Sequence, residues 1–292
     1  MLTVFDSAFS PKACHHLHTA ASLGGLGDEC HTLFHRAELS PRTPLETGLD
    51  SVLRELGDDA PFVEYWWRDE WEHVEAHADV DEYLFERDET FRYPRNAHVL
   101  YLCVRGGVRG PTCVWERGDS EEDDPFGPMT VVPAREGRLL RFDGALMHAV
   151  PRPVDIWTKP HGVRAPPKKV DNPVRSVLLF NTWTQPPLNV DDEPATDPME
   201  SADEMAAEYG GAAVEELLAI MSAPEVECEP AGQWARVPVA REEAEEEPSS
   251  LRLSLLGGPT RRGHPERKIE LATGGGLLDA LVEPEKVRRL SR

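Results

Sequence analysis

The sequence predicts a mainly β fold, a sandwich or jelly roll, with helices packed against its outside. Three observations lead to this expectation. Two helical patterns lie near the N-terminus, a series of short strand-like runs follows them as far as Trp183, and clusters of Gly, Pro and Asp separate these runs. We therefore expect a mixed α+β chain whose core is built from sheets.

The N-terminal part begins with a short apolar run, Leu2–Phe5, which predicts a strand. Ser10 and Pro11 follow, as the N-cap and first residue of a helix that runs to about Leu23 and ends at a Gly-Gly pair. A second helix is expected over Pro44–Leu56, because its leucines and its valine fall on one face and a glycine follows it.

The predicted strands begin after Pro61, where aromatic and β-branched residues become dense. Between the last two runs lies a segment rich in proline and charge, 151–172, which predicts a long loop near the mouth of a barrel. The runs are Phe62–Ala76, Ala97–Val104, Thr112–Glu116, Met129–Pro133, Arg138–Phe142, His148–Val150 and Val174–Trp183.

The chain divides by composition into a folded part, residues 1–184, and two C-terminal parts. Residues 185–250 read as an acidic linker with a helix over 202–222, and residues 191–250 hold 18 acidic and 2 basic residues. Residues 251–292 carry a net charge of +4. They predict an extension made of a hairpin, 251–255 with 267–271, and a helix over 277–290.

The charge and the cysteines limit the partners. The net charge of −22 argues against nucleic acid or an anionic membrane as the main partner, since both require a basic face. Five scattered cysteines without a CxxC pair indicate free thiols in a reducing compartment. With no membrane-spanning run and no signal-peptide pattern, we expect a cytoplasmic location. The sequence does not predict the oligomeric state.

A metal site is predicted from three residues. His77 and Asp79 are two apart at the end of a predicted strand, so they share a face and can occupy adjacent corners of one metal. His148, which follows an apolar strand and an Asp-Gly turn, is the natural third ligand. Two histidines and one carboxylate form the facial triad of non-haem Fe(II) oxygenases, with three positions left open. His73 and Glu75 are a rival pair on the same strand parity.

Arg175 is a candidate anion ligand. It lies in NPVRSVLLFNTW, whose residues are apolar on both faces of the predicted strand. A guanidinium there either marks the end of the strand or points inward at an anion, because a buried charge must be paired. Its planar fork matches a carboxylate.

The motifs HADVDE, HVLYLCVRGGVRGPTCVW, GRLLRFDGALMHAV and VRSVLLFNTW resemble, in this order, the core of the prolyl-hydroxylase-like 2-oxoglutarate and Fe(II)-dependent dioxygenases. The resemblance covers about residues 1–184. It implies a double-stranded β-helix (a cupin-like jelly roll), with iron at His77, Asp79 and His148. Arg175 would hold the distal carboxylate of 2-oxoglutarate, with Tyr101 against the same carboxylate. The 27 positions from His148 to Arg175 exceed the family's usual spacing, and we attribute the excess to the proline-rich loop.

The resemblance implies an enzyme that uses Fe(II), 2-oxoglutarate and O2, with ascorbate as a candidate reductant. It would hydroxylate a C–H bond of a protein side chain, such as proline, or of a small molecule, and release succinate and CO2. Two alternatives stay open: a catalytically silent jelly roll with an acidic interaction tail, and a cupin-like metal enzyme that does not use 2-oxoglutarate. The identity of the prime substrate is beyond the sequence.

Overall fold

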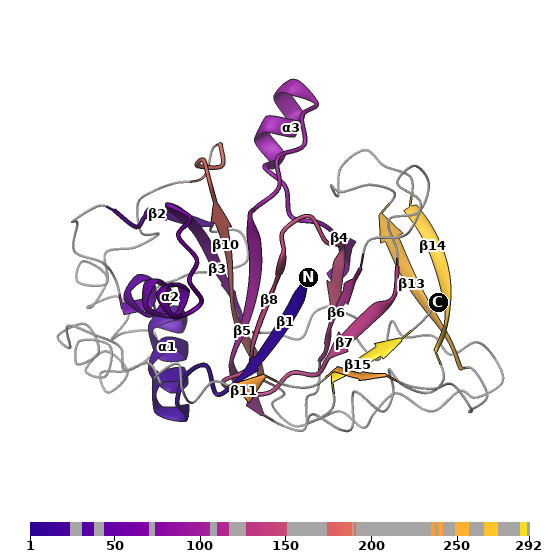
Figure 1. Ribbon diagram of the computed structural model, residues 1–292, viewed down its shortest axis with the longest axis horizontal. Coiled ribbons are helices and arrows are strands. Elements are labelled where there is room, and N and C mark those ends of the chain that lie inside the picture. The colour runs from indigo at the N-terminus through magenta and orange to yellow at the C-terminus, as the bar shows by residue number, and fades with distance from the viewer. Residues whose placement is uncertain are drawn as a thin grey trace.

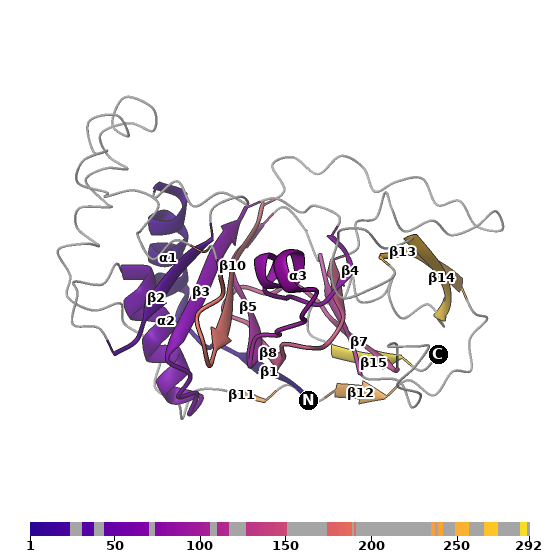
Figure 2. The ribbon, with the colours of Figure 1, turned by 90° about the horizontal axis from the view of Figure 1, so that it is seen from above.

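The fold was examined in a computed structural model of the chain. It describes residues 1–23, 31–37, 44–69, 74–105, 110–116, 127–150, 174–188 and 190. It also describes the backbone of 235–236, 239–241, 249–256, 266–273 and 287–290. Figures 1 and 2 show how the helices and strands formed by these residues are arranged.

Two helices lie near the N-terminus and a series of strands follows them, as expected. The helices are α1 (Pro11–Leu23), α2 (Pro44–Glu55) and α3 (Glu82–Asp88). The strands up to residue 183 are β1 (Leu2–Asp6), β2 (Thr32–His35), β3 (Phe62–Arg68), β4 (Val74–His77), β5 (Asn96–Arg105), β6 (Thr112–Trp115), β7 (Met129–Val132), β8 (Leu139–Asp143), β9 (His148–Val150) and β10 (Val174–Trp183).

The strands pair as a jelly roll. β3 pairs with β10, β4 with β9, β5 with β8 and β6 with β7, so each pair is nested inside the previous one and all are antiparallel. These pairs are divided between two sheets. The first sheet contains the strand order β8-β5-β10-β3, and the second contains the order β7-β6-β9-β4. This is the connectivity of a double-stranded β-helix, so the predicted fold class is confirmed.

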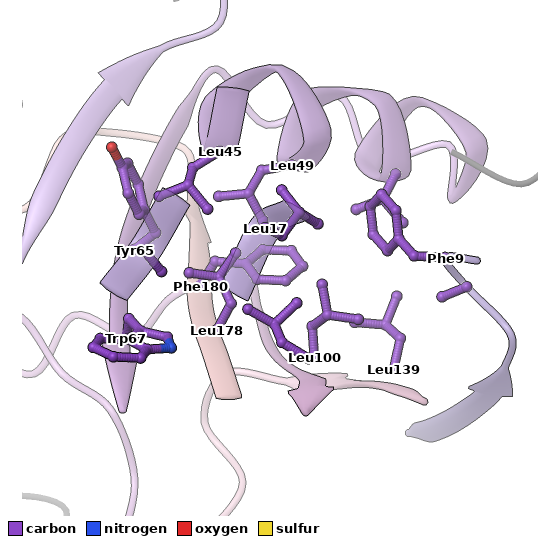
Figure 3. Packing of buried hydrophobic residues seen from close by; sticks show 14 of the residues in the cluster. Phe9, Leu17, Leu45, Leu49, Tyr65, Trp67, Leu100, Leu139, Leu178 and Phe180 are labelled. Carbon is purple, nitrogen blue, oxygen red and sulfur yellow. The ribbon is translucent and has the colours of Figure 1, made fainter. Parts of the chain in front are cut away.

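Helices α1 and α2 cover the outer face of the first sheet (Figures 1 and 3). Leu17 of α1 and Leu45 and Leu49 of α2 pack against Leu178 and Phe180 of β10 in one buried cluster. The apolar stripe of each helix and the outward parity of the strand residues explain this layer. The Ser10 hydroxyl accepts a hydrogen bond from the backbone N–H of Ala13 (3.1 Å), as expected for an N-cap.

The space between the two sheets is filled mainly by apolar residues. Val99 and Tyr101 of β5, Val114 of β6 and Val177 of β10 belong to one buried cluster there. Because side chains alternate along a strand, the residues of β10 that share the parity of Val177 also face inward, among them Arg175. The register of β10 against β5 shifts between Ser176 and Val177.

The structure corrects the predicted organisation after Pro61 in two places. The aromatic run Phe62–Ala76 is not one strand, because β3 ends at Arg68 and β4 belongs to the other sheet. Helix α3 was not expected. Asp81, which precedes it, is buried, and its Oδ1 caps the helix by accepting a hydrogen bond from the N–H of Leu84 (2.9 Å). The aspartate that begins DEYLFERD was the N-cap signal.

The C-terminal strands extend both sheets. They are β11 (Ala235–Arg236), β12 (Val239–Arg241), β13 (Ser249–Leu256), β14 (Glu266–Thr273) and β15 (Val287–Leu290). β11 pairs with β1, β13 meets β4, and β15 pairs with β7, while β13 and β14 form an antiparallel pair. The division of the chain at residues 184 and 250 stays a prediction.

One expectation for the C-terminal part needs correction, the helix over 277–290. Residues 287–290 are a strand and not the end of a helix, because the open edge of β7 offers backbone partners that a short Val-Arg-Arg-Leu segment can use. The start of the expected linker is anchored, since Arg92 donates hydrogen bonds to the side chain of Gln185 (3.1 Å) and the carbonyl of Pro186 (2.8 Å). The predicted helix over 202–222 lies outside the described residues.

Cysteines and helix lengths complete the description. Of the five cysteines, Cys14, Cys103 and Cys113 are described, and all three are buried free thiols, as expected. None of the three described helices combines the length and apolar character that crossing a bilayer demands.

Candidate metal centre and anion site

The two histidines of the predicted metal site face each other across a strand pair. His77, the last residue of β4, is directly opposite His148, the first residue of β9, and their ring centroids are 4.3 Å apart. Opposite residues of an antiparallel pair share a face, so both imidazoles lie on the same side of the second sheet.

The turn before β9 explains why His148 begins the strand where it does. Asp143 accepts two hydrogen bonds within the turn, from Ala145 N to its Oδ1 (3.0 Å) and from Leu146 N to its carbonyl (2.9 Å). A Cβ at Gly144 would collide with the Pro94 carbonyl, so this turn requires glycine. The Asp-Gly pair of the sequence thus fixes the approach of β9 to β4.

Asp79 lies beyond β4, so strand parity alone does not place it beside His77. Nevertheless, its Oδ1 is 3.5 Å from His77 Nε2 and 3.8 Å from His148 Nε2. One ligand atom from each of the three residues lies within 4.8 Å of the others. The structure therefore brings the three predicted ligands together.

These residues fit a metal ion. Two ligand atoms at right angles, each about 2.1 Å from a metal, lie about 3.0 Å apart, so the three atoms, which lie within 4.8 Å of one another, need to close by less than about 2 Å. The Nδ1–H of His148 donates to the carbonyl of Leu146 (3.3 Å), which leaves the lone pair of Nε2 directed at the common point. Two neutral imidazoles and one carboxylate suit a divalent iron, zinc or nickel ion, and the set is the facial triad.

The carboxylate of the triad is held in its charged form. Burial would raise the pKa of Asp79, but the charge of His148, the hydrogen bond and charge of His77 and the hydrogen bond from Asn181 outweigh it, and the pKa is lowered. A charged carboxylate beside two imidazoles is the state that binds a cation.

Asn181 is a site residue that the sequence reasoning missed. It lies on β10, in the other sheet, and its Nδ2 donates to Asp79 Oδ2 (3.2 Å). The two carboxylate oxygens thus have different partners, with Oδ1 facing the histidines and Oδ2 facing Asn181. The inward parity of Asn181 with Arg175 on one strand was the signal that could have identified it.

Arg175 is buried, with 3% of its surface exposed, and it lies on the inner face of β10. Its Nε donates to the carbonyl of Gly110 (3.0 Å) and its Nη2 to the hydroxyl of Thr112 (3.4 Å). Burial lowers the pKa of Arg175, because the charged guanidinium is removed from water. Within the described residues no carboxylate pairs with it, so its charge is satisfied only by neutral acceptors.

Tyr101 lies beside Arg175, with the guanidinium carbon 5.3 Å from the centre of its ring. The hydroxyl groups of Tyr101 and Thr112 are hydrogen-bonded (2.8 Å). Thr112, on β6 of the other sheet, therefore contacts both residues predicted to bind the co-substrate and is a second residue that the sequence reasoning missed.

The rival pair of metal ligands lies outside the described part of the chain, since neither His73 nor the side chain of Glu75 is described.

The fold and these side chains define a double-stranded β-helix with a candidate metal-binding triad at one end. The solved structures to which the model is similar include HygX from Streptomyces hygroscopicus with nickel and 2-oxoglutarate bound, which is 14% identical with a TM-score of 0.37. They also include a Pseudomonas putida prolyl-4-hydroxylase, 11% identical with a TM-score of 0.40. A third is the viral collagen prolyl hydroxylase vCPH from Paramecium Bursaria Chlorella virus-1, 16% identical with a TM-score of 0.35.

The similarity spans most of each of those three chains and a little under two thirds of this chain. The matches cover 63%, 63% and 62% of this chain and 82%, 85% and 87% of HygX, the Pseudomonas enzyme and vCPH respectively. No family model and no curated protein matches the sequence. At TM-scores below 0.5 these structures do not decide what this chain does, so its function has to follow from its own side chains.

Proposed function

We propose that the protein is an Fe(II)- and 2-oxoglutarate-dependent dioxygenase that hydroxylates a C–H bond. The observation that carries the proposal is the pairing of two sites on facing sheets, the triad His77–Asp79–His148 and the buried cation Arg175. A metal triad alone would fit many oxygen- or water-activating enzymes. The buried guanidinium adds a requirement for an anion in the same interior.

The roles of the residues follow from their positions. His77, Asp79 and His148 would hold Fe(II) on one face and leave three positions for ligands other than protein. Arg175 would bind the distal carboxylate of 2-oxoglutarate, with Tyr101 and Thr112 holding the guanidinium in place from β5 and β6. With iron and 2-oxoglutarate bound, the chemistry supplied would be a four-electron reduction of O2, in which two electrons come from the oxidative decarboxylation of 2-oxoglutarate to succinate and CO2 and two come from the C–H bond that becomes C–OH.

The interior between the two sites supports this use. Val99, Val114, Val177 and Leu179 surround it with apolar side chains. An apolar surrounding strengthens the pairing of Arg175 with a carboxylate and keeps bulk water from the reacting atoms. The chain's own contribution is therefore orientation and exclusion of water.

The test combines two binding titrations with one activity measurement on the purified chain. Ni(II) and then 2-oxoglutarate are titrated in a calorimeter, and succinate is measured with Fe(II) in air. We expect Asp79→Ala to abolish metal binding. We expect Arg175→Leu to bind Ni(II) as the wild type does and to lose at least about 2 kcal/mol of 2-oxoglutarate affinity, roughly thirtyfold, because one partner of a buried charge pair is removed.

Two results would support the alternatives. Metal binding without any 2-oxoglutarate binding would favour a cupin-like enzyme that does not use the co-substrate. Failure of the wild type to bind Ni(II), Fe(II) or Zn(II) would favour a silent jelly roll.

A further inference from the structure

The segment between Asp79 and β5 forms an arm beside the metal triad. We define the arm as residues 81–93, which contain α3. Figure 1 shows α3 projecting beyond the ends of both sheets, and Figure 2, from above, shows it between β10 and β4. The base of the arm, Asp81, is two residues from the metal ligand Asp79. The arm therefore stands at the end of the sheets where the triad lies.

The arm is firmly attached at its base. The Oδ2 of Asp81 accepts hydrogen bonds from Arg92 and from the backbone N–H of Leu188 (3.0 Å), and the Asp81 N–H donates to the Arg92 carbonyl (2.9 Å). Arg92 in turn donates to Gln185 and Pro186. The Asp81–Arg92 ion pair thus closes the base of the arm, and the hydrogen bonds to residues 185–188 hold that base to the segment after β10, which argues against a loosely packed loop.

The arm carries an exposed row of aromatic rings. Apart from Met1, the large hydrophobic side chains that are exposed in the described part of the chain are Tyr83, Phe91 and Tyr93, all on the arm. Phe85 stacks on Phe91 (ring centroids 4.6 Å apart, planes at 19°), and Phe91 lies nearly parallel to Tyr93 at 6.3 Å. Contiguous exposed apolar side chains on a folded protein mark an interaction surface.

The charges of the arm indicate what it binds. Residues 81–93 contain five acidic and two basic residues. The arm therefore has a net charge of −3, and Glu82, Glu86 and Glu89 are exposed on it. The faces of aromatic rings and carboxylates both attract cations, and here they occupy one surface.

We propose that the arm docks a cationic polypeptide segment, with Lys or Arg side chains against its rings and carboxylates, and that this segment is the prime substrate. The second half of this proposal rests on the proposed function. The exposed rings Tyr83, Phe91 and Tyr93 lie within two residues of Asp81 or Arg92, the pair that closes the base of the arm. The base is also next to the triad, because Asp81 is two residues from Asp79. A polypeptide segment bound along this row of rings can therefore place one of its own side chains at the triad.

The experiment measures binding of fluorescein-labelled peptides to the full chain by fluorescence anisotropy. The probes are peptides of repeating Lys-Leu-Gly units, the same peptides with Arg for Lys, and the same peptides with Glu for Lys. We expect the cationic peptides to bind and the Glu peptides not to bind, with an affinity that falls as salt is added. Binding should persist in the presence of a chelator, because the arm lies outside the metal triad.

Two variants and one matched control identify the surface. The double variant Phe91→Ser with Tyr93→Ser should raise the Kd by at least about tenfold, as loss of central contacts of an interface does. Glu82→Gln should weaken binding, whereas Glu55→Gln, an equally exposed helix carboxylate on α2, should not. Far-UV circular dichroism of each variant checks that the chain is folded, and the conservative Glu82→Gln keeps the test valid if the double variant does not fold.

The outcomes separate the two proposals. Unchanged peptide affinity in the Phe91/Tyr93 double variant, or a preference for the Glu peptides, would overturn the docking proposal. So would dimerisation of the wild type that the double variant loses, since the arm would then bind a second copy of the chain. Peptide binding through the arm in a chain that binds neither Ni(II) nor 2-oxoglutarate would reject the proposed dioxygenase instead. A gain of succinate formation on adding the cationic peptides supports both.

Discussion

Asn181 should control the metal affinity of the triad although it does not contact the metal. Its amide holds Asp79 Oδ2 (3.2 Å) while Oδ1 faces both histidines, so it fixes the rotation of the carboxylate. Asp79 lies past the end of β4 and has no strand neighbours to orient it. We therefore predict that Asn181→Leu, which keeps the volume and removes the donor, weakens metal binding.

The magnitude follows from the geometry. A hydrogen bond to a charged group contributes about 1.5–3 kcal/mol, and a donor-to-acceptor distance at the long end of the normal range argues for the smaller value. A loss of about 1.5 kcal/mol corresponds to roughly a tenfold rise in the Kd for metal. Partners of metal ligands in other proteins contribute about 10- to 100-fold, which brackets this value.

The assay is calorimetric titration of Ni(II), together with thermal unfolding with and without the metal. Asn96→Leu is the matched control, because Asn96 Nδ2 also donates to a carboxylate, Asp58 Oδ2 (2.8 Å), away from the triad. Both variants should lower the stability of the metal-free chain, but only Asn181→Leu should reduce the stabilisation by Ni(II). An unchanged Kd in Asn181→Leu, or an equal change in Asn96→Leu, would refute the reasoning.

Two further predictions concern stability. Burial lowers the pKa of His98 to about 3, against the opposing charge of Asp58, so between pH 6.5 and 3 the unfolded chain binds more protons. The unfolding free energy should therefore decrease as the pH is lowered through this window, by up to about 1.4 kcal/mol per pH unit. Chemical unfolding at several pH values should show a weaker dependence of the unfolding free energy on pH for His98→Asn. Asp81→Ala removes the N-cap of α3 and the partner of Arg92, and should cost about 2–4 kcal/mol. Asp88→Ala, which breaks the exposed pair with Arg87, should change the unfolding free energy by less than about 1 kcal/mol, and similar losses for both would contradict the anchoring of the arm.

Helices α1 and α2 and most strands were predictable because their signals are local. Ser10 caps α1, and the apolar stripe of α2 meets the sheet as its periodicity indicates. The division of Phe62–Ala76 between two sheets was not predictable in this way, because both pieces carry the same aromatic and β-branched residues. Nothing local marks where a strand leaves one sheet for the other, since that depends on pairing with β10 and β9.

The residues of the candidate site were likewise only partly predictable from the sequence. His77, Asp79 and His148 could be found because their residue types are the ligands of a metal and a family resemblance gave their order. The expected reason for pairing His77 with Asp79, shared strand parity, was wrong, since Asp79 lies beyond β4. Asn181 and Thr112 were missed because an amide and a hydroxyl on apolar strands are common, and their importance comes only from contacts over long separations in sequence.

Those two missed residues also explain how the candidate sites keep a fixed separation. The metal ligands belong to one sheet, or follow one of its strands, whereas Arg175 and Asn181 both belong to β10 of the other. At one end Asn181 joins the sheets through Asp79, and at the other end Arg175 joins them through Thr112. Sliding of the sheets would break both links, so the distance from the triad to the guanidinium is set before any ligand binds. Under the proposed function, a 2-oxo acid whose far carboxylate reaches Arg175 while its near end meets the metal would be selected by length. We therefore expect 2-oxo diacids one methylene shorter or longer than 2-oxoglutarate to lose one of the two contacts.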